Sequence, residues 1–217
     1  MRDEWSRFVF ATVIFQSPNA EEARGVLDGS FRKYGLPKAI RSDNGAPFAC
    51  TRALGGLTKL SAQWIALGIK IDRMDPGNPQ QNGGHERMHR DIRGEIETSP
   101  ANDVATQQEL LEHWRFEFNH ERPHEALDLK TPAEVYSRSP RRYSGKRPEV
   151  VYPDGFEVRV VQRNGCVKYH QRRQFVSEAL ASWPVGLEHS DQKLRVWFAD
   201  RLLGVTDSQL SSPIEAL

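Results

Sequence analysis

Two acidic residues, Asp43 and Glu86, lie in settings that suit a metal site. Asp43 follows the apolar run Ala39-Ile40 and precedes Asn44-Gly45, so we expect it at the end of a strand, just before a turn. Glu86 follows a stretch rich in Pro and Gly and precedes a run broken only by Gly94, so we expect it in the first turn of a helix. Carboxylate oxygens are the ligands that Mg²⁺ prefers. The sequence therefore predicts that Asp43 and Glu86 bind Mg²⁺ or Mn²⁺, with open positions left for water and phosphate.

The same helix offers a second kind of metal chemistry. His85-Glu-Arg-Met-His89 satisfies the HExxH pattern of zinc metalloproteases, in which two histidines one helical turn apart bind Zn²⁺. Arg87 and Arg90 are charged where such a helix is usually apolar, and Ile92 replaces the Gly of the longer form of the motif. A zinc metalloprotease is therefore a remote alternative, which retention of stoichiometric zinc through purification would favour.

The elements that would position these residues alternate along the first two thirds of the chain. Apolar runs predict strands at 8–15, 39–43 and 69–74, and helical spacing of apolar residues predicts helices at 19–34, 57–67, 85–97 and 107–121. This βαβαβα order is typical of an α/β layer fold. From residue 152 the pattern changes to short strands at 156–161, 167–176, 185–188 and 194–198, with Asn164-Gly165 as a hairpin signal.

Four segments add a more specific indication. They are Tyr34–Pro37 leading into Arg41–Gly45, then Pro79–Arg90, then Asn119–His124 with Ala126-Leu127, and finally Thr131–Ala133 before Tyr136. In this order and at these spacings, the segments resemble the retroviral-integrase-type catalytic core of bacterial insertion-sequence transposases. The resemblance covers about residues 5–136. It implies an RNase H-like core and a DNA transposase or integrase that performs Mg²⁺-dependent end cleavage and strand transfer.

The resemblance also assigns roles to individual residues. Asp43 would be the second and Glu86 the third of three catalytic acidic residues. Second-tier candidates are Asn44, Gly45, Gln81, Asn82 and Gly83. The family's first catalytic Asp lies on a strand before the one that resembles Trp5–Phe15, and Asp3 aligns better with a non-catalytic acidic residue. We therefore expect an N-terminally truncated core without its first strand and first Asp, and an inactive chain. The alternative is a DNA-binding remnant or a regulatory subunit of a transposase.

Basic residues predict DNA contacts in two regions. At about 100° per residue, the helix at 85–97 has a polar stripe and an apolar stripe. The polar stripe carries Glu86, Arg90, Arg93 and Glu97, and the apolar stripe carries Met88, Ile92 and Ile96. The resemblance places Arg90 and Arg93 against DNA, although pairing with Glu86 and Glu97 would also explain them. Arg122 is a further candidate, and Asn119, Pro123 and His124 have an expected structural role.

The second basic region extends from Arg138 to Arg173, where ten Lys or Arg residues accompany three acidic ones. Neutralisation of DNA phosphates would explain this excess, and a solvated linker is the alternative. The predicted DNA-binding residues of this region are Arg141, Arg142, Lys146, Arg147, Lys168, Arg172 and Arg173.

Composition and length are consistent with two small domains. The chain has 217 residues, of which 38% are hydrophobic and 27% charged, which is ordinary for a globular protein. We expect a partial catalytic core at 1–136, a basic linker at 137–151, a small all-β SH3-like DNA-binding domain at 152–210 and a tail at 211–217. Cys50 and Cys166 are expected to be free thiols. We also expect a cytoplasmic location, DNA as partner, no membrane contact and a homo-multimer on DNA.

Overall fold

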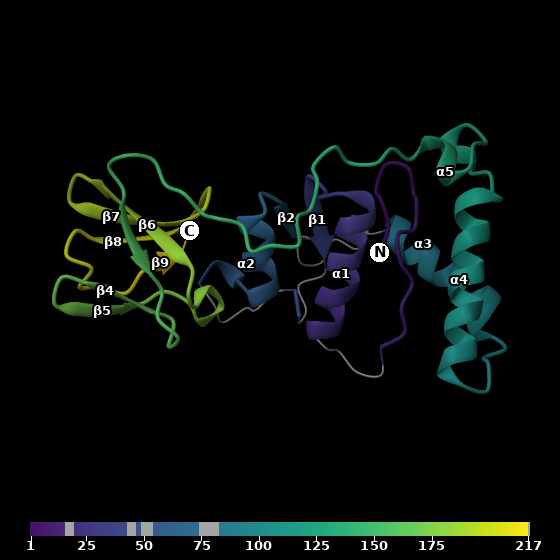
Figure 1. Ribbon diagram of the computed structural model, residues 1–217, viewed down its shortest axis with the longest axis horizontal. Coiled ribbons are helices and arrows are strands. Elements are labelled where there is room, and N and C mark those ends of the chain that lie inside the picture. Colours follow the sequence, from purple (N-terminus) through teal and green to yellow (C-terminus); the bar gives the residue numbers. More distant parts are fainter. Residues whose placement is uncertain (16–19, 43–46, 49–53, 74–82, 217) are drawn as a thin grey trace. The chain divides into compact units, whose positions relative to one another are not determined.

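The protein is a mixed α/β chain that divides into two compact units. The computed structural model describes residues 1–15, 20–42, 47–48, 54–73 and 83–216 (Figure 1). One unit comprises Met1–Leu36 and Met74–Ser144, and the other comprises Pro37–Arg73 and Gly145–Leu217. This division differs from the linear boundaries expected at 136 and 152, because residues 37–73 group with the C-terminal strands. Those boundaries stay a prediction.

The first unit is helical. Its elements are α1 (Ala20–Tyr34), α3 (Gly83–Ile92), the π-helical turn η3 (Arg93–Glu97), α4 (Val104–His120), the 3₁₀ turn η4 (Glu125–Leu127) and α5 (Pro132–Val135). The predicted end of α1 is confirmed. Gly35 follows it with a φ of 84°, and a Cβ there would lie 2.7 Å from the carbonyl oxygen of Ser139. Asp103 begins α4 by accepting a hydrogen bond from the backbone N–H of Thr106 at 2.9 Å.

The core of the first unit lies between α3, α4 and the N-terminal segment. It contains Val9, Met88, Ile92, Leu111, Trp114 and Phe118, all of them buried. Beside this core, the Phe8 ring stacks on Tyr136, with ring centroids 4.6 Å apart.

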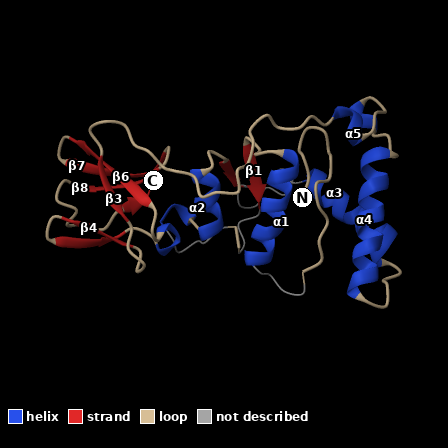
Figure 2. Cartoon of the chain, in the orientation of Figure 1, coloured by secondary structure: helices blue, strands red, loops and turns tan. Residues whose placement is uncertain are grey.

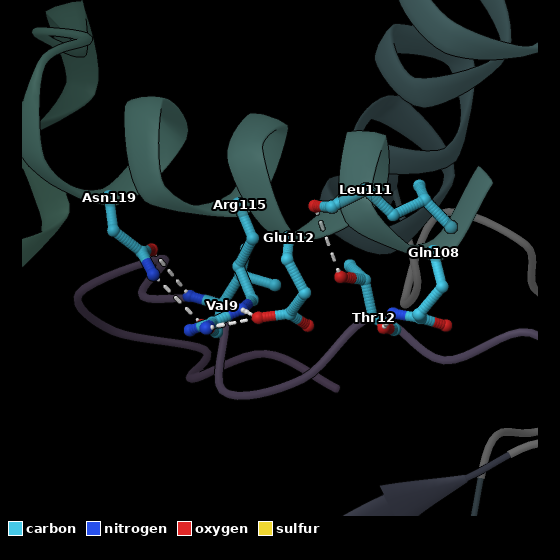
Figure 3. Close-up of polar contacts among 7 residues, drawn as sticks. All are labelled: Val9, Thr12, Gln108, Leu111, Glu112, Arg115 and Asn119. Atoms are coloured by element: carbon cyan, nitrogen blue, oxygen red, sulfur yellow. Dashed lines mark hydrogen bonds and ion pairs between the residues drawn. The ribbon is translucent and has the colours of Figure 1, made fainter. Parts of the chain in front are cut away.

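The predicted strand at 8–15 is wrong. Residues 11–15 have no regular secondary structure, and Val9 forms only an isolated bridge with Arg2. Side chains of α4 take the place of a neighbouring strand (Figure 3). The Asn119 amide accepts a hydrogen bond from Val9 N–H at 2.8 Å and donates one to Val9 C=O at 2.9 Å, as a strand partner would. Gln108 similarly donates to Thr12 C=O at 2.7 Å and accepts from Ile14 N–H at 3.0 Å.

The second unit combines a small parallel pair with a larger antiparallel sheet (Figure 2). Strand β1 (Ala39–Ser42) pairs in parallel with β2 (Lys70–Arg73), and the 3₁₀ turn η1 (Leu54–Gly56) and helix α2 (Lys59–Ala66) lie between them in sequence. Thr58 and Ser61 form a capping box at the start of α2.

The antiparallel sheet has the strand order β3-β6-β7-β8-β9, and β4 and β5 form a separate hairpin. The bounds are β3 (Glu157–Val160), β4 (Cys166–Tyr169), β5 (Arg172–Phe175), the 3₁₀ turn η5 (Glu178–Leu180), β6 (Pro184–Ser190), β7 (Lys193–Phe198), β8 (Arg201–Asp207) and β9 (Glu215–Ala216). Their shared core includes Val185, Leu187 and Phe198, and Ala62 and Ile65 of α2 pack into it. Helix α2 therefore belongs to the same hydrophobic core as the strands.

Most of the predicted elements are confirmed, with differences in the C-terminal strands. The stretch predicted as one strand at 167–176 is two strands, because the chain turns at His170 and Gln171. The tail adds a short strand, in which Glu215 pairs with Val205. Cys166 is a free cysteine, whereas Cys50 lies outside the residues that the structure describes. Among the residues that the structure describes, no helix is long and apolar enough to cross a membrane.

The paired hydrogen bonds of Asn119 lead to a stability prediction. Asn119→Leu leaves the N–H and C=O of Val9 buried without partners, so the free energy of unfolding of the first unit should fall by about 2–4 kcal/mol. Amide hydrogen exchange at Val9 should also accelerate. The exposed Asn102→Ala change is the matched control, and equal protection of Val9 in all three proteins would contradict the strand-partner role of Asn119.

Candidate functional site

Helix α3 presents Glu86 to solvent because its opposite face is buried. Met88 and Ile92 are 3% and 6% exposed and pack against Trp114 and Phe118 of α4. Glu86 lies in the first turn of the helix, as predicted, and is exposed. It forms no hydrogen bond or ion pair with any residue that the structure describes. Its carboxylate is therefore available to an external ligand.

The second predicted ligand follows strand β1 directly. Strand β1 ends at Ser42, and within it Arg41 forms a 2.7 Å ion pair with Asp72 of β2. Asp43 itself lies outside the described residues, as do Asn44, Gly45, Gln81 and Asn82. The pairing of Asp43 with Glu86 therefore stays a prediction. Gly83, the remaining second-tier candidate, is the first residue of α3 and is exposed.

The two arginines on the polar stripe of α3 differ in their surroundings. Arg93 forms an exposed ion pair with Glu97 at 3.8 Å, so surface pairing accounts for part of its environment. Arg90 is exposed and has no ion pair within the described part of the chain. An exposed pair such as Arg93–Glu97 contributes at most a few tenths of a kcal/mol, so an anion can displace Glu97 at little cost.

His85 and His89 face each other on α3, with their Nε2 atoms 3.0 Å apart. Burial, together with the neighbouring His89, lowers the pKa of His85 to about 4, and burial also lowers the pKa of His89. At neutral pH both rings are therefore uncharged, and one Nε2 donates to the other. Among the described residues, no group of three His, Cys, Asp or Glu side chains could hold a metal ion. The HExxH alternative thus lacks a third ligand there.

The β4–β5 hairpin places two basic side chains, Lys168 and Arg173, on the same face. Val167 and Tyr169 are buried, which leaves Lys168 between them on the exposed face. Lys168 lies directly opposite Arg173 in the antiparallel register, and Arg172 lies opposite Tyr169. Like charges directly opposite each other destabilise a strand pair, so this arrangement costs stability unless an anion covers it.

The other predicted DNA-binding residues near the linker lie in different environments. Arg142 and Lys146 are exposed. Arg147 lies 3.8 Å from the centroid of the Trp183 ring and donates to the carbonyl of Ser182 at 2.8 Å, so packing fixes its guanidinium. Arg141 is partly buried, and its backbone carbonyl accepts a hydrogen bond from Leu36 N–H.

Comparison with known proteins finds a family match in the region that contains α3 and α4. Residues 67–132 match the integrase core domain family. An uncharacterized 31.7 kDa protein of the insertion element IS407 from Burkholderia multivorans (strain ATCC 17616 / 249) is 33% identical over 114 residues, which are 52% of this chain and 38% of that protein. The chain is therefore similar to the integrase core domain over residues 67–132, and to an insertion-element protein over about half of its length. The match spans less than two fifths of the IS407 protein.

A solved structure is also similar to this chain. It is a chain of the cryo-EM structure of a simian T-cell lymphotropic virus intasome in complex with PP2A regulatory subunit B56 gamma. The similarity covers 95% of this chain and 71% of that chain, with a TM-score of 0.46 and 18% identity. Within the present chain, the integrase-core match contains Glu86 and Arg122 and ends before the β4–β5 hairpin.

Arg122, which lies within the integrase-core match, connects two helical elements. Its guanidinium donates to Glu95 Oε1 at 2.7 Å and lies 2.6 Å from Glu95 Oε2 and 3.3 Å from Glu117 Oε2. The π-helical turn η3 directs Glu95 toward α4, where Glu95 also accepts a hydrogen bond from Trp114 Nε1 at 3.1 Å. The hydrogen bond from Arg122 lowers the pKa of Glu95 below its ordinary value of 4.5. A contact of Arg122 with DNA stays a prediction, and it would have to compete with these carboxylates.

The ion pair between Arg122 and Glu95 gives a pH-dependent prediction. Arg122→Gln should lower the free energy of unfolding by about 1 kcal/mol at pH 7, a modest value because both side chains are partly exposed. Because the folded-state pKa of Glu95 is depressed, the stabilisation is complete above pH 4.5 and disappears as the pH falls through the folded-state pKa. Urea unfolding of both proteins across this pH range measures the difference. A difference that persists unchanged in acid would contradict the assigned pairing.

Proposed function

We propose that this chain is the catalytic-core part of a DNA transposase, a polynucleotidyl transferase that cleaves the ends of an insertion element and joins them to target DNA. The observation that carries the proposal is the exposed carboxylate of Glu86 in the first turn of α3, which no described residue binds and which lies inside the integrase-core match. The apolar face of α3 packs against α4, so the Glu86 carboxylate on the opposite face points to solvent. Arg90 lies on the same stripe as Glu86, where its positive charge would attract a DNA phosphate.

Asp43 and Glu86 are the proposed ligands of Mg²⁺ or Mn²⁺. Glu86 fits this role because its carboxylate supplies hard oxygen ligands and forms no hydrogen bond or ion pair with another described residue. A bound divalent ion would supply Lewis-acid stabilisation of the phosphoryl group and activation of the attacking oxygen. The protein residues hold and orient the DNA: the arginines of α3 attract its phosphates, and the buried face of α3 keeps the helix in place.

The proposed architecture has two functional parts. The parallel β1–β2 pair with α1–α4 corresponds to the RNase H-like core, and the strands from β3 onward correspond to an SH3-like DNA-binding domain. DNA is the proposed partner of both parts, in a homo-multimer. The like-charged Lys168–Arg173 pair of the hairpin supports the second assignment, because phosphate binding would offset its repulsion.

A second candidate function is DNA binding without catalysis, as a remnant or regulatory subunit of a transposase. The basic β4–β5 hairpin favours it, because this surface requires neither Asp43 nor Glu86. Variants that remove the acidic residues and variants that remove the hairpin charges therefore separate the two functions.

Glu86→Gln tests the catalytic proposal. In an assay in which the transposase carries out strand transfer with Mg²⁺ or Mn²⁺, this variant should lose at least about a hundredfold in rate, because Gln retains the helix but not the metal-binding charge. DNA affinity should change less than twofold. Glu109→Gln on the exposed face of α4 is the matched control, and near-normal strand transfer by Glu86→Gln would refute the site assignment.

The hairpin has its own test. Lys168→Gln combined with Arg173→Gln should weaken duplex binding and make the slope of log affinity against log salt less negative by about 0.9 for each phosphate that is no longer neutralised. Stability should stay equal or rise slightly, because a like-charged cross-strand pair is removed. The control, Lys59→Gln with Lys193→Gln, removes two exposed charges elsewhere in the same unit. If the slope of log affinity against log salt does not change, the hairpin does not bind DNA phosphates and is a solvated surface.

A further inference from the structure

A pocket in the first unit brings together two arginines of the N-terminal segment and one arginine of α3. It has a volume of about 210 Å³, and Arg2, Arg7 and Arg87 contribute to its lining. Asp91 and Glu125 also line it, and Met88 and Phe118 supply apolar surface. The lining thus includes three arginines and two acidic residues, a formal excess of one positive charge.

The arginines of this pocket form no direct ion pair with a residue that the structure describes. Arg2 donates to the carbonyl of Gly84 at 2.9 Å. Among the described residues, no carboxylate forms an ion pair with Arg2, Arg7 or Arg87. Burial lowers the pKa of Arg2; nearby Glu4 and Asp3 raise it, and nearby Arg7 lowers it further. Cations that lie close together without direct ion pairs repel one another, and a bound anion would relieve this repulsion.

His124 supplies a second, independent observation. It lines the same pocket, and its Nε2 atom is buried without a hydrogen-bond partner in the described part of the chain. Burial lowers the pKa of His124, and Arg7 again acts in the same direction. Buried polar atoms are nearly always hydrogen-bonded in folded proteins, so the orphaned Nε2 indicates a missing partner. A bound anion would favour the protonated imidazolium, whose Nε2–H would then donate to an oxygen of the anion.

We propose that this pocket binds a backbone phosphate of DNA, at a point on the strand away from the reacting phosphodiester. This inference rests on the proposed function. Gly84, Arg87, Met88 and Asp91 are spaced as one face of α3, whereas Glu86 lies on a different face of the same helix. The two faces are separated by about the 10 Å diameter of a helix, which corresponds to roughly three nucleotides of a strand at 3.4 Å rise. The pocket positions the DNA and takes no part in the chemical step.

Arginine is well suited to this role, because its planar fork of donors matches the geometry of phosphate oxygens. Gly84 makes the arrangement possible: a Cβ at this position would collide with the Arg2 guanidinium. Gly84→Ala therefore displaces Arg2 without changing any charge, and Ala favours the helix over Gly by about 1 kcal/mol, so folding is preserved.

The test is binding of a fluorescein-labelled duplex by the full chain, followed by anisotropy over a range of salt concentrations. Arg7→Gln with Arg87→Gln should reduce affinity roughly tenfold and make the log–log salt slope less negative by about 0.9. Gly84→Ala should reduce affinity by about threefold at unchanged net charge. Arg24→Gln with Lys130→Gln, which removes two charges of the same unit outside the pocket, should change affinity less than twofold.

The outcomes separate failure of the phosphate-pocket proposal from failure of the proposed transposase function. Duplex binding by the unmodified chain that neither pocket variant weakens would overturn the pocket and leave the proposed function intact. Absence of duplex binding by the unmodified chain would overturn both. Inorganic phosphate is the second probe: if it shifts the His124 imidazole signals in NMR spectra and the duplex does not, the pocket takes a free anion, and its assignment to DNA is wrong.

Discussion

Burial of one face of α3 against α4 determines where the polar groups of this helix point. Met88 and Ile92 contact the core that Trp114 and Phe118 provide, and this fixes the rotation of the helix about its axis. Glu86 and Arg90 then face solvent, while Gly84 and Arg87 line the arginine pocket. Burying these two apolar side chains contributes several kcal/mol, more than any single exposed ion pair on the helix. Loss of this packing would disturb the predicted site and the pocket together.

The small net charge of the protein hides a difference between arginines that pair with carboxylates and arginines that do not. The net charge is +1, yet several arginines are committed to carboxylates and others are not. Arg115 pairs with Glu112, and Arg122 pairs with Glu95 and Glu117, which leaves their charges largely compensated. Arg7, Arg87 and Arg90 have no such partner among the described residues. These uncompensated cations lie on or beside the helix that carries Glu86, where a polyanion could contact them.

Local patterns predicted the parts of the structure that depend on local physics. The 3.6-residue spacing of Met88 and Ile92 predicted the buried face of α3, and the apolar run before Asp43 predicted strand β1. The strand expected at 8–15 failed because a strand needs a partner, and the partner of Val9 is the side chain of Asn119, 110 residues away. The arginine pocket was missed for a similar reason: Arg2, Arg87 and His124 share no sequence neighbourhood, and only the fold brings them together.

The proposed catalytic role requires that Asp43 and Glu86 hold one divalent site, and Mn²⁺ can report on both residues at once. In NMR spectra of the full chain, a Mn²⁺ ion broadens backbone amide signals in its immediate neighbourhood. We predict that substoichiometric Mn²⁺ broadens the amides around Glu86 and around Asp43 in parallel, and that excess Mg²⁺ restores both sets. Broadening around only one of the two residues, or centred on His85 and His89 and resistant to Mg²⁺, would contradict a shared site.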